Sequence, residues 1–399
     1  MNPDNYLFRA PLTDAAQCVG GYQLSWQDAD ASAGQARPDQ TKQLLALAAQ
    51  FPRRAGSGLF FMEIQVAALS ADHLQPLNPA ETVLMFKQAE MACPEGIELA
   101  ISLHAQGFGL ALCHPDVALF DEKDGLLSLM TYVVADLANP DLARIASLAA
   151  LAQPALELLV SKVTDWSAFD ACAALGLAGF FGNLCALPRN LPRISHMGPQ
   201  TVLILQLMKM AQEYADIREM EKVLQRDAIL SYQLLRYINS AGYGLQMEIE
   251  SLRHAITMLG YLPLYRWLAL LLASTSTAGF SPVLLQTAIV RGRFVELLGK
   301  GLLPASEAGN LFVVGLFSLL DQLLGIPMPQ LMQQVSMPGA IVQALLHRGD
   351  IYGPLLALAE ACEDESGSAP VLADALFMTA SQVNKAHGSA IVWAQDLNL

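Results

Sequence analysis

Up to about residue 190 the chain alternates short apolar runs with longer helical stretches, and this alternation constrains the fold more than any other feature. Strands of a parallel sheet are buried on both faces, so they read as nearly continuous apolar runs. The runs predicted as strands are 21–26, 58–64, 81–87, 108–113, 131–137, 156–163 and 177–183. Such alternation is typical of parallel strands joined by crossover helices, and seven or eight units of this kind predict a closed barrel.

The pattern changes at a proline-rich stretch, 187–200, which is predicted to be an inter-domain linker. Beyond it the sequence is helical almost throughout, with helices predicted to start near residues 200, 217, 227, 249, 263, 282, 305, 327, 338, 352 and 370. The run 311–325 is apolar nearly all round and is predicted to be a central core helix, whereas the acidic stretch 360–370 is predicted to be a solvated loop. The predicted fold class is therefore multidomain α/β plus all-α, with a barrel in 1–190 and a helical domain in 200–399.

The composition is apolar, with 53% hydrophobic and only 15% charged residues, which predicts large cores or an extensive interface. A membrane protein is the rival explanation, but a spanning helix needs roughly 20 apolar residues. The longest clean run, Leu311–Leu320, is shorter and ends at Asp321. The first ten residues also lack the basic start and apolar core of a secretion signal. We therefore expect a cytoplasmic protein without membrane insertion. The net charge of −14 argues against nucleic acid as a partner.

The reactive residues do not form a recognisable catalytic pattern. The six cysteines, at 18, 93, 113, 172, 185 and 362, include no Cys-x-x-Cys pair and are predicted to be buried thiols rather than disulfides or a zinc site. Cys113 and His114 are adjacent on a predicted strand, so their side chains point to opposite faces; we expect a buried cysteine and a surface histidine. The chain contains no His-Asp dipeptide and no Gly-rich phosphate loop. These observations predict no metal, no cofactor and no catalytic residue.

Residues 224–260, LQRDAILSYQLLRYINSAGYGLQMEIESLRHAITMLG, closely resemble the signature of HDOD domains. The resemblance lies in a Leu-rich helix that ends in an Asn-Ser pair, an aromatic-Gly step, and an Ala-Ile-x-x-Leu-Gly helix. HDOD domains resemble metal-dependent HD phosphohydrolases but lack the metal ligands, so the resemblance implies interaction rather than catalysis. The residues that it marks as interaction candidates are Arg236, Asn239, Ser240, Tyr243 and Gly244.

The Asn239-Ser240 pair allows two interpretations of its role. Asparagine often ends a helix in a left-handed conformation, and its amide can satisfy carbonyls of the last turn, so we expect a structural role for Asn239. The alternative is a ligand site. Arg236 and Gln233 share the polar face of the same helix with Ser240 and are predicted to be solvated, lining an interaction groove.

The first half resembles a degenerate EAL domain, the barrel that hydrolyses cyclic di-GMP. Residues 8–27, FRAPLTDAAQCVGGYQLSWQ, resemble the opening hairpin of that family, and residues 159–188 resemble its last two strands. The resemblance implies an active site of carboxylates and an Asn that hold two divalent cations, which activate water and bind the phosphodiester.

Most positions that the resemblance assigns to this chemistry carry other residues. The motif Glu falls on Gln23 and the Arg that follows it on Gln27; Asp136 is kept, and Glu63 lies one residue from an expected Asn. The lost positions singled out in the predicted site are Gln23, Gln27, Met85, Cys113, His114 and Phe181, and the resemblance also assigns lost charged residues to Val134, Ser161 and Thr164. Because one carboxylate cannot hold two metals, we predict a pseudoenzyme.

The sequence therefore predicts a non-catalytic bacterial signal-transduction protein that acts through unidentified signalling partners, with a link to cyclic di-GMP or motility implied by resemblance alone. A second hypothesis is a catalytically dead receptor, whose barrel binds cyclic di-GMP and whose HDOD domain transmits the signal. The missing Arg at Gln27 instead predicts weak or no nucleotide binding. A third hypothesis, a phosphohydrolase in the helical half, lacks the His-Asp pair that it needs. The oligomeric state and the arrangement of the domains are left open.

Overall fold

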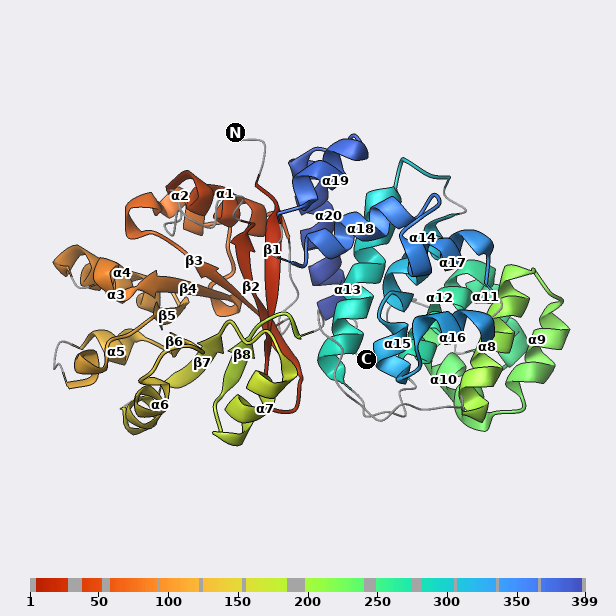
Figure 1. The fold of residues 1–399 in the computed structure, drawn as a ribbon, viewed down its shortest axis with the longest axis horizontal. Helices are drawn as coiled ribbons and strands as arrows, with labels where there is room; N and C mark the ends of the chain where they lie inside the picture. Colours follow the sequence, from red (N-terminus) through yellow and green to blue (C-terminus); the bar gives the residue numbers. More distant parts are fainter. Residues whose placement is uncertain are drawn as a thin grey trace. The chain divides into compact units, whose positions relative to one another are not determined.

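The computed structural model describes residues 5–27, 38–51, 58–91, 93–121, 125–152, 156–184, 198–239, 249–274, 281–304, 307–334, 337–364 and 367–396. The chain forms two compact units (Figure 1). We call Met1–Arg189 together with Leu358–Leu399 the barrel unit, and Asn190–Ala357 the helical unit. Most of the predicted linker, residues 187–197, lies outside the described residues.

The barrel unit contains a closed eight-stranded barrel with the strands in chain order, as predicted (Figure 1). β1 runs antiparallel to its neighbours β2 and β8, and every other pair is parallel. The strands are β1 (Leu7–Thr13), β2 (Val19–Trp26), β3 (Leu59–Glu63), β4 (Thr82–Lys87), β5 (Gly109–Cys113), β6 (Tyr132–Asp136), β7 (Glu157–Ser161) and β8 (Gly179–Phe181). Every predicted strand is thus confirmed to within a few residues at each end.

Helices connect the parallel strands, and several are trimmed to a single turn. They are α1 (Pro38–Ala48), α2 (Ala71–Leu74), α3 (Gln88–Met91), α4 (Pro94–Ala105), α5 (Leu126–Leu129), α6 (Leu142–Leu151) and α7 (Trp166–Ala174), with short 3₁₀ turns at Val66–Ala68, Pro79–Glu81 and Val117–Asp121. Asp165 begins α7 by accepting a hydrogen bond from the Ala168 N–H.

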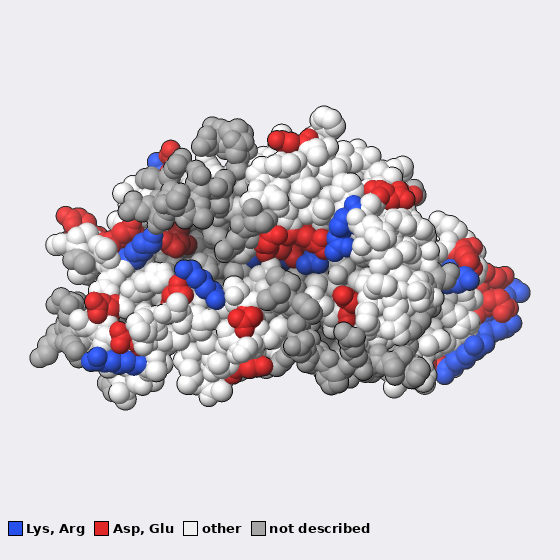
Figure 2. Space-filling model, in the orientation of Figure 1, with Lys and Arg blue, Asp and Glu red and all other residues white. Residues whose placement is uncertain are grey.

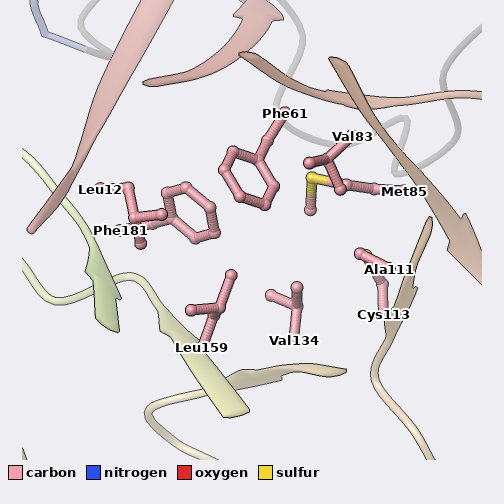
Figure 3. Packing of buried hydrophobic residues seen from close by; sticks show 9 residues of the cluster. All are labelled: Leu12, Phe61, Val83, Met85, Ala111, Cys113, Val134, Leu159 and Phe181. Carbon is pink, nitrogen blue, oxygen red and sulfur yellow. The ribbon is translucent and has the colours of Figure 1, made fainter. Parts of the chain in front are cut away.

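The barrel interior is filled by apolar side chains. Successive side chains of a strand point to opposite faces, so alternate residues of each strand turn inward. The inward residues pack as one cluster that is at most 8% exposed: Leu12, Phe61, Val83, Met85, Ala111, Cys113, Val134, Leu159 and Phe181 (Figure 3). Phe61 lies at the centre of the aromatic contacts, with its ring 5.1 Å from that of Phe181 and 5.3 Å from that of Tyr132. The interior is therefore a packed core.

The helical unit contains α8 to α17 and the start of α18. Their bounds are α8 (Pro199–Gln212), α9 (Ile217–Leu224), α10 (Ala228–Ile238), α11 (Leu252–Leu259), α12 (Tyr261–Ser274), α13 (Pro282–Gly299), α14 (Ala308–Phe317), α15 (Leu320–Leu324), α16 (Met328–Gln334), α17 (Gly339–His347) and α18 (Gly353–Ala361). The predicted helix starts agree with these bounds to within three residues, because prolines and capping residues mark most of them in the sequence.

The predicted core run 311–325 is confirmed as buried, but it forms two helices. α14 crosses α13 so closely that a Cβ on Gly315 would lie 2.5 Å from the Arg291 carbonyl oxygen. The helix ends where Ser318 donates a hydrogen bond to the Gly315 carbonyl at 2.7 Å and accepts one from the Arg291 guanidinium at 2.7 Å. A serine hydroxyl that bonds back to the preceding turn competes with the helix, which explains the break.

None of the described helices is, taken singly, of sufficient length and hydrophobicity to cross a membrane. The pair α11 and α12 meets that requirement only when taken together, across a bend of 109°.

Residues Leu358–Leu399, which we call the return segment, belong to the barrel unit by their contacts, although the sequence predicted them within the helical domain. The segment contains the end of α18, α19 (Ala369–Ala375) and α20 (Ala380–Gln395), and α20 lies beside β1 and α1 (Figure 1). The prediction of a solvated loop in 360–370 is wrong for Cys362 and Glu363, which are 0% and 3% exposed. Glu363 is buried because it pairs with Arg9 of β1.

Candidate functional site at the carboxyl end of the barrel

Enzymes built on parallel barrels place their chemistry at the carboxyl ends of the strands. In this chain the inward-facing residues at that end follow the core cluster by two positions. Glu63 follows Phe61 on β3, Lys87 follows Met85 on β4, and Asp136 follows Val134 on β6. The register pairs Cys113 of β5 with Lys87 and Val134. The candidate site is therefore a layer of charged side chains above an apolar core.

The two carboxylates of this layer are each paired with a lysine. Glu63 Oε1 lies 3.1 Å from Lys87 Nζ, and Asp136 Oδ2 lies 2.7 Å from Lys162 Nζ. Burial alone would raise the pKa of Asp136, but hydrogen bonds from Lys162 and from the Ala138 N–H, with the nearby His114, lower it below its ordinary value. Asp136 is therefore ionised at neutral pH and already neutralised by an ammonium group.

Two residues at this end adopt left-handed backbone conformations. His114 follows β5 with φ 52°, and Lys162 follows β7 with φ 62°. Such conformations are unfavourable for residues other than glycine, and they are found most often at functional sites or sharp turns. Here they turn the chain as it leaves the strand, which brings Lys162 back over Asp136.

The residues predicted to have replaced catalytic ligands mostly lie in the barrel interior. Met85, Cys113 and Phe181 belong to the core cluster, and Gln23 is half-buried at the register position opposite Phe61. Burial raises the pKa of the Cys113 thiol far above neutrality, so no thiolate forms. His114 is exposed, which confirms the prediction of a buried cysteine beside a surface histidine. The prediction that all six cysteines are buried is wrong for Cys18 and Cys93, which are exposed.

Within the described part of the chain, no three His, Cys, Asp or Glu side chains gather closely enough to hold a metal ion. Glu63 and Asp136 lie on β3 and β6, so they are not neighbours in the barrel. Below the two carboxylates, the core cluster supplies the thioether of Met85, the buried thiol of Cys113 and the aromatic carbon of Phe181, none of which is a ligand that Mg²⁺ or Mn²⁺ prefers.

Gln27, to which the EAL resemblance assigns the lost arginine, forms hydrogen bonds with the backbone of the return segment. Its amide nitrogen donates to the carbonyl oxygens of Ala361 at 2.6 Å and of Asp364 at 2.8 Å. Asn183, which follows β8, donates in the same way to the carbonyl of Glu363. Sequence reasoning missed Asn183 and Glu363, because residues 180 positions apart carry no local signal of their contact.

The HDOD signature is only partly described. Asn239 ends α10 with φ −83°, so the predicted left-handed conformation is wrong. Its side chain instead donates to the Ile249 carbonyl and accepts from the Ile249 N–H, each at 2.9 Å. This two-bond bridge joins the end of α10 to the chain before α11. Ser240, Tyr243 and Gly244 lie outside the described residues.

One face of α10 exposes two large apolar side chains and an arginine. Leu230, Leu234 and Ile238 form the buried stripe of the helix. On the other side Ile229 and Tyr232 are each 65% exposed, and Arg236, at the next helical step, is exposed as predicted. We call Ile229, Tyr232 and Arg236 the α10 face. Aromatic, apolar and arginine side chains together are the composition typical of protein-binding surfaces.

Charged side chains are sparse over the surface that Figure 2 draws, where most atoms belong to neither Lys, Arg, Asp nor Glu. This agrees with the 15% of charged residues in the chain.

Residues 197–325 match the HDOD domain family. Among curated proteins, the uncharacterized protein YuxH of Bacillus subtilis is 26% identical over 286 residues, which are 69% of each chain. The cyclic di-GMP phosphodiesterase CdgJ of Vibrio cholerae is 27% identical over 206 residues, which are 51% of this chain and 48% of that protein. The present chain thus spans about half the length of CdgJ in this match.

Among solved structures, the EAL domain of Mycobacterium smegmatis DcpA is similar with a TM-score of 0.36 and 16% identity, covering 45% of this chain and 90% of that one. The HDOD resemblance found in the signature at 224–260 falls inside the matched range and is confirmed. The helical unit therefore contains a segment, residues 197–325, that matches the HDOD domain family.

Proposed function

We propose that this protein is a non-catalytic regulator in cyclic di-GMP signalling, in which the barrel is a pseudoenzyme and the helical unit binds a partner protein. The place in cyclic di-GMP signalling is supported by the relative CdgJ, a cyclic di-GMP phosphodiesterase by name. The loss of catalysis is supported by one observation above all: both carboxylates of the candidate site, Glu63 and Asp136, are paired with lysines.

The physical argument concerns charge. Two-metal hydrolysis requires several oxygen ligands around each cation, so that the metals can activate water and stabilise the developing negative charge. Here an ammonium nitrogen lies 2.7 Å from Asp136 and another lies 3.1 Å from Glu63. A divalent cation would have to displace both lysines, and it would then find two carboxylates on the non-adjacent strands β3 and β6.

The test of this part is hydrolysis of cyclic di-GMP by the full chain with excess Mn²⁺, beside an active EAL phosphodiesterase as the positive control. We expect no turnover above the enzyme-free reaction. We also expect none from the double variant Lys87→Met/Lys162→Met, because freeing the carboxylates does not replace the ligands missing at Gln23, Met85 and Phe181. Turnover that a chelator abolishes would overturn the pseudoenzyme assignment.

The partner-binding part rests on the α10 face, where two large apolar side chains and an arginine stand exposed on the HDOD domain. The test compares proteins retained from native extract by tagged full-length variants. Ile229→Ser, Tyr232→Ser and Arg236→Glu should each reduce the specific partner at least tenfold, as expected for an interface hot spot. Matched controls are Leu151→Ser and Leu175→Ser on the barrel unit, where the original side chains are 78% and 62% exposed. If the control variants retain less partner and the α10 variants retain as much as the wild type, the interface lies on the barrel unit.

A nucleotide receptor is the alternative to this proposal. It needs a charged donor for the phosphates at the rim of the barrel. The ammonium groups at this end, of Lys87 and Lys162, are paired with Glu63 and Asp136. Gln27 supplies only an amide, which is already bonded to two carbonyls of the return segment. The proposal therefore gives the barrel no nucleotide affinity in the micromolar range.

A further inference from the structure

The barrel closes between its first and last strands through a short pairing. β8 pairs with β1 only at Leu12 and Thr13, and the Gly182 N–H adds one long hydrogen bond to the Pro11 carbonyl at 3.4 Å. Among the residues that the structure describes, no strand lies beside the amino-terminal part of β1 on that edge. An uncovered edge presents backbone N–H and C=O groups that need other partners.

The return segment supplies those partners. Asn384 of α20, which is 6% exposed, accepts a hydrogen bond from the Leu7 N–H at 2.8 Å and donates one to the Asn5 carbonyl at 2.7 Å. One side-chain amide thus pairs with β1 as a neighbouring strand would. α20 also packs closely against Phe51, which follows α1. A Cβ added to Gly388 would lie only 2.1 Å from the Phe51 ring.

A buried ion pair holds the other end of the return segment. Arg9 Nη2 of β1 lies 2.8 Å from Glu363 Oε1, and their side chains are only 3% and 4% exposed. Arg9 alternates with the inward Leu12 and Ala10, so it projects from the outer wall of the barrel, where its guanidinium lies 5.8 Å from the ring centre of Tyr22. Breaking such a pair leaves a buried charge without compensation, which is strongly unfavourable.

Around the Arg9–Glu363 pair, residues 361–364 lie along the carboxyl rim. Gln27 follows β2 and Asn183 follows β8, and these strands flank β1 in the barrel. Both amides donate to main-chain carbonyls of the return segment, at Ala361, Glu363 and Asp364. The amide donors of Gln27 and Asn183 are therefore used in hydrogen bonds to the chain's own backbone.

We propose that the return segment is a strap that completes the barrel unit and keeps this side of its carboxyl rim closed, with the Arg9–Glu363 pair as its latch. The helical unit is then an insertion within the barrel unit in chain order, joined to it at both ends. Opening the strap uncovers the donors of Arg9, Gln27 and Asn183 together with the β1 edge. The inference goes beyond the proposed function, because it holds whether or not the barrel is catalytic.

The test is hydrogen–deuterium exchange of the full chain, read peptide by peptide, for the wild type and Glu363→Gln. Loss of one partner of a buried ion pair should increase the opening equilibrium on the order of 100-fold. We expect faster exchange over β1 and α20 together, with α13 and α14 unchanged. The matched control is Asp364→Asn, which removes the same charge from the exposed neighbouring residue and should leave exchange within about threefold of the wild type.

A double variant keeps the test decisive if Glu363→Gln disrupts folding more widely. Arg9→Met/Glu363→Leu replaces the pair by apolar side chains and should recover most of the protection that either single variant loses. The proposal is overturned if Glu363→Gln leaves the exchange of α20 unchanged. It is equally overturned if α20 exchanges in step with α13 and α14 rather than with β1, since the return segment would then belong to the helical unit.

Discussion

The interior of the barrel and the seam between β1 and the return segment are built on opposite principles. The interior, where the EAL resemblance implies polar ligands, is an apolar cluster with Met85, Cys113 and Phe181 at the replaced positions. The seam, on the outer wall, buries an arginine, a glutamate, an asparagine and a histidine. The buried polar groups of the seam thus pair with other parts of the same chain.

Buried polar groups are costly unless they are paired, so the seam should be far more sensitive to substitution than its size suggests. The interior should behave as an ordinary core, in which changes of similar volume are tolerated. Substitutions at four positions test this contrast.

Asn384→Leu should have the largest effect, because it leaves the Leu7 N–H and the Asn5 carbonyl without their partner. Each buried unpaired group costs about 1–3 kcal/mol, so we expect the free energy of unfolding to fall by about 2–5 kcal/mol. Denaturant unfolding followed by tryptophan fluorescence measures it. The interior control Met85→Leu should cost less than about 1.5 kcal/mol. An equal loss in the two variants would remove the contrast between seam and interior.

Asn239→Leu tests whether an amide bridge has the same role in the helical unit. The variant loses both hydrogen bonds to Ile249, and we expect a loss of about 1–3 kcal/mol in the free energy of unfolding. Arg236→Leu, three residues earlier on the exposed face, should change it by less than about 0.5 kcal/mol. Thermal and denaturant melts of the full chain measure both losses in the free energy of unfolding. Equal losses would mean that the two hydrogen bonds of Asn239 do not stabilise the helical unit.

His387 makes the stability of the seam depend on pH. Complete burial and, to a smaller extent, the nearby charge of Arg9 lower the pKa of His387 to about 3 from its ordinary value of 6.5. The unfolded chain therefore binds the proton first, so stability is complete above pH 6.5 and falls as the pH drops toward 3.

The slope approaches about 1.4 kcal/mol per pH unit inside that window, and between pH 7 and 5.5 we expect a loss of about 1 kcal/mol from this group. Unfolding midpoints at the two pH values measure the loss, and His387→Gln should reduce it by that amount. A pH dependence that the substitution does not alter would show that the histidine titrates normally.

Lys162→Ala should have the smallest effect on stability, because Lys162 is 73% exposed and surface ion pairs contribute at most about 1 kcal/mol. Its clear consequence is on titration: without the ammonium, the pKa of Asp136 should rise from its lowered value. Carboxyl chemical shifts followed by NMR across acidic pH measure this change. An unchanged pKa would mean that Lys162 does not neutralise Asp136 in solution.

The sequence predicted the barrel and the helix starts because both depend on local patterns. Apolar runs, prolines and capping residues mark strands and helices within a few positions. The seam could not be predicted in this way, since Arg9 and Glu363 are 354 residues apart. Glu363 also lies in an acidic stretch whose local composition is typical of a solvated loop. For Asn239 the residue type correctly indicated a structural role, but its partner, Ile249, was set by the tertiary fold and not by the left-handed conformation that asparagine often adopts.

The central claim, that the carboxyl end of the barrel is no longer a site for cyclic di-GMP and its metals, is tested most directly by calorimetric titration of cyclic di-GMP into the full chain in the presence of Mn²⁺. Each charge-assisted hydrogen bond that a phosphate loses costs about 1.5–3 kcal/mol, so losing two or three weakens a micromolar ligand by several orders of magnitude. The account predicts no binding tighter than about 100 μM on this arithmetic. A stoichiometric isotherm with a low-micromolar dissociation constant would contradict it and would make the barrel a nucleotide receptor.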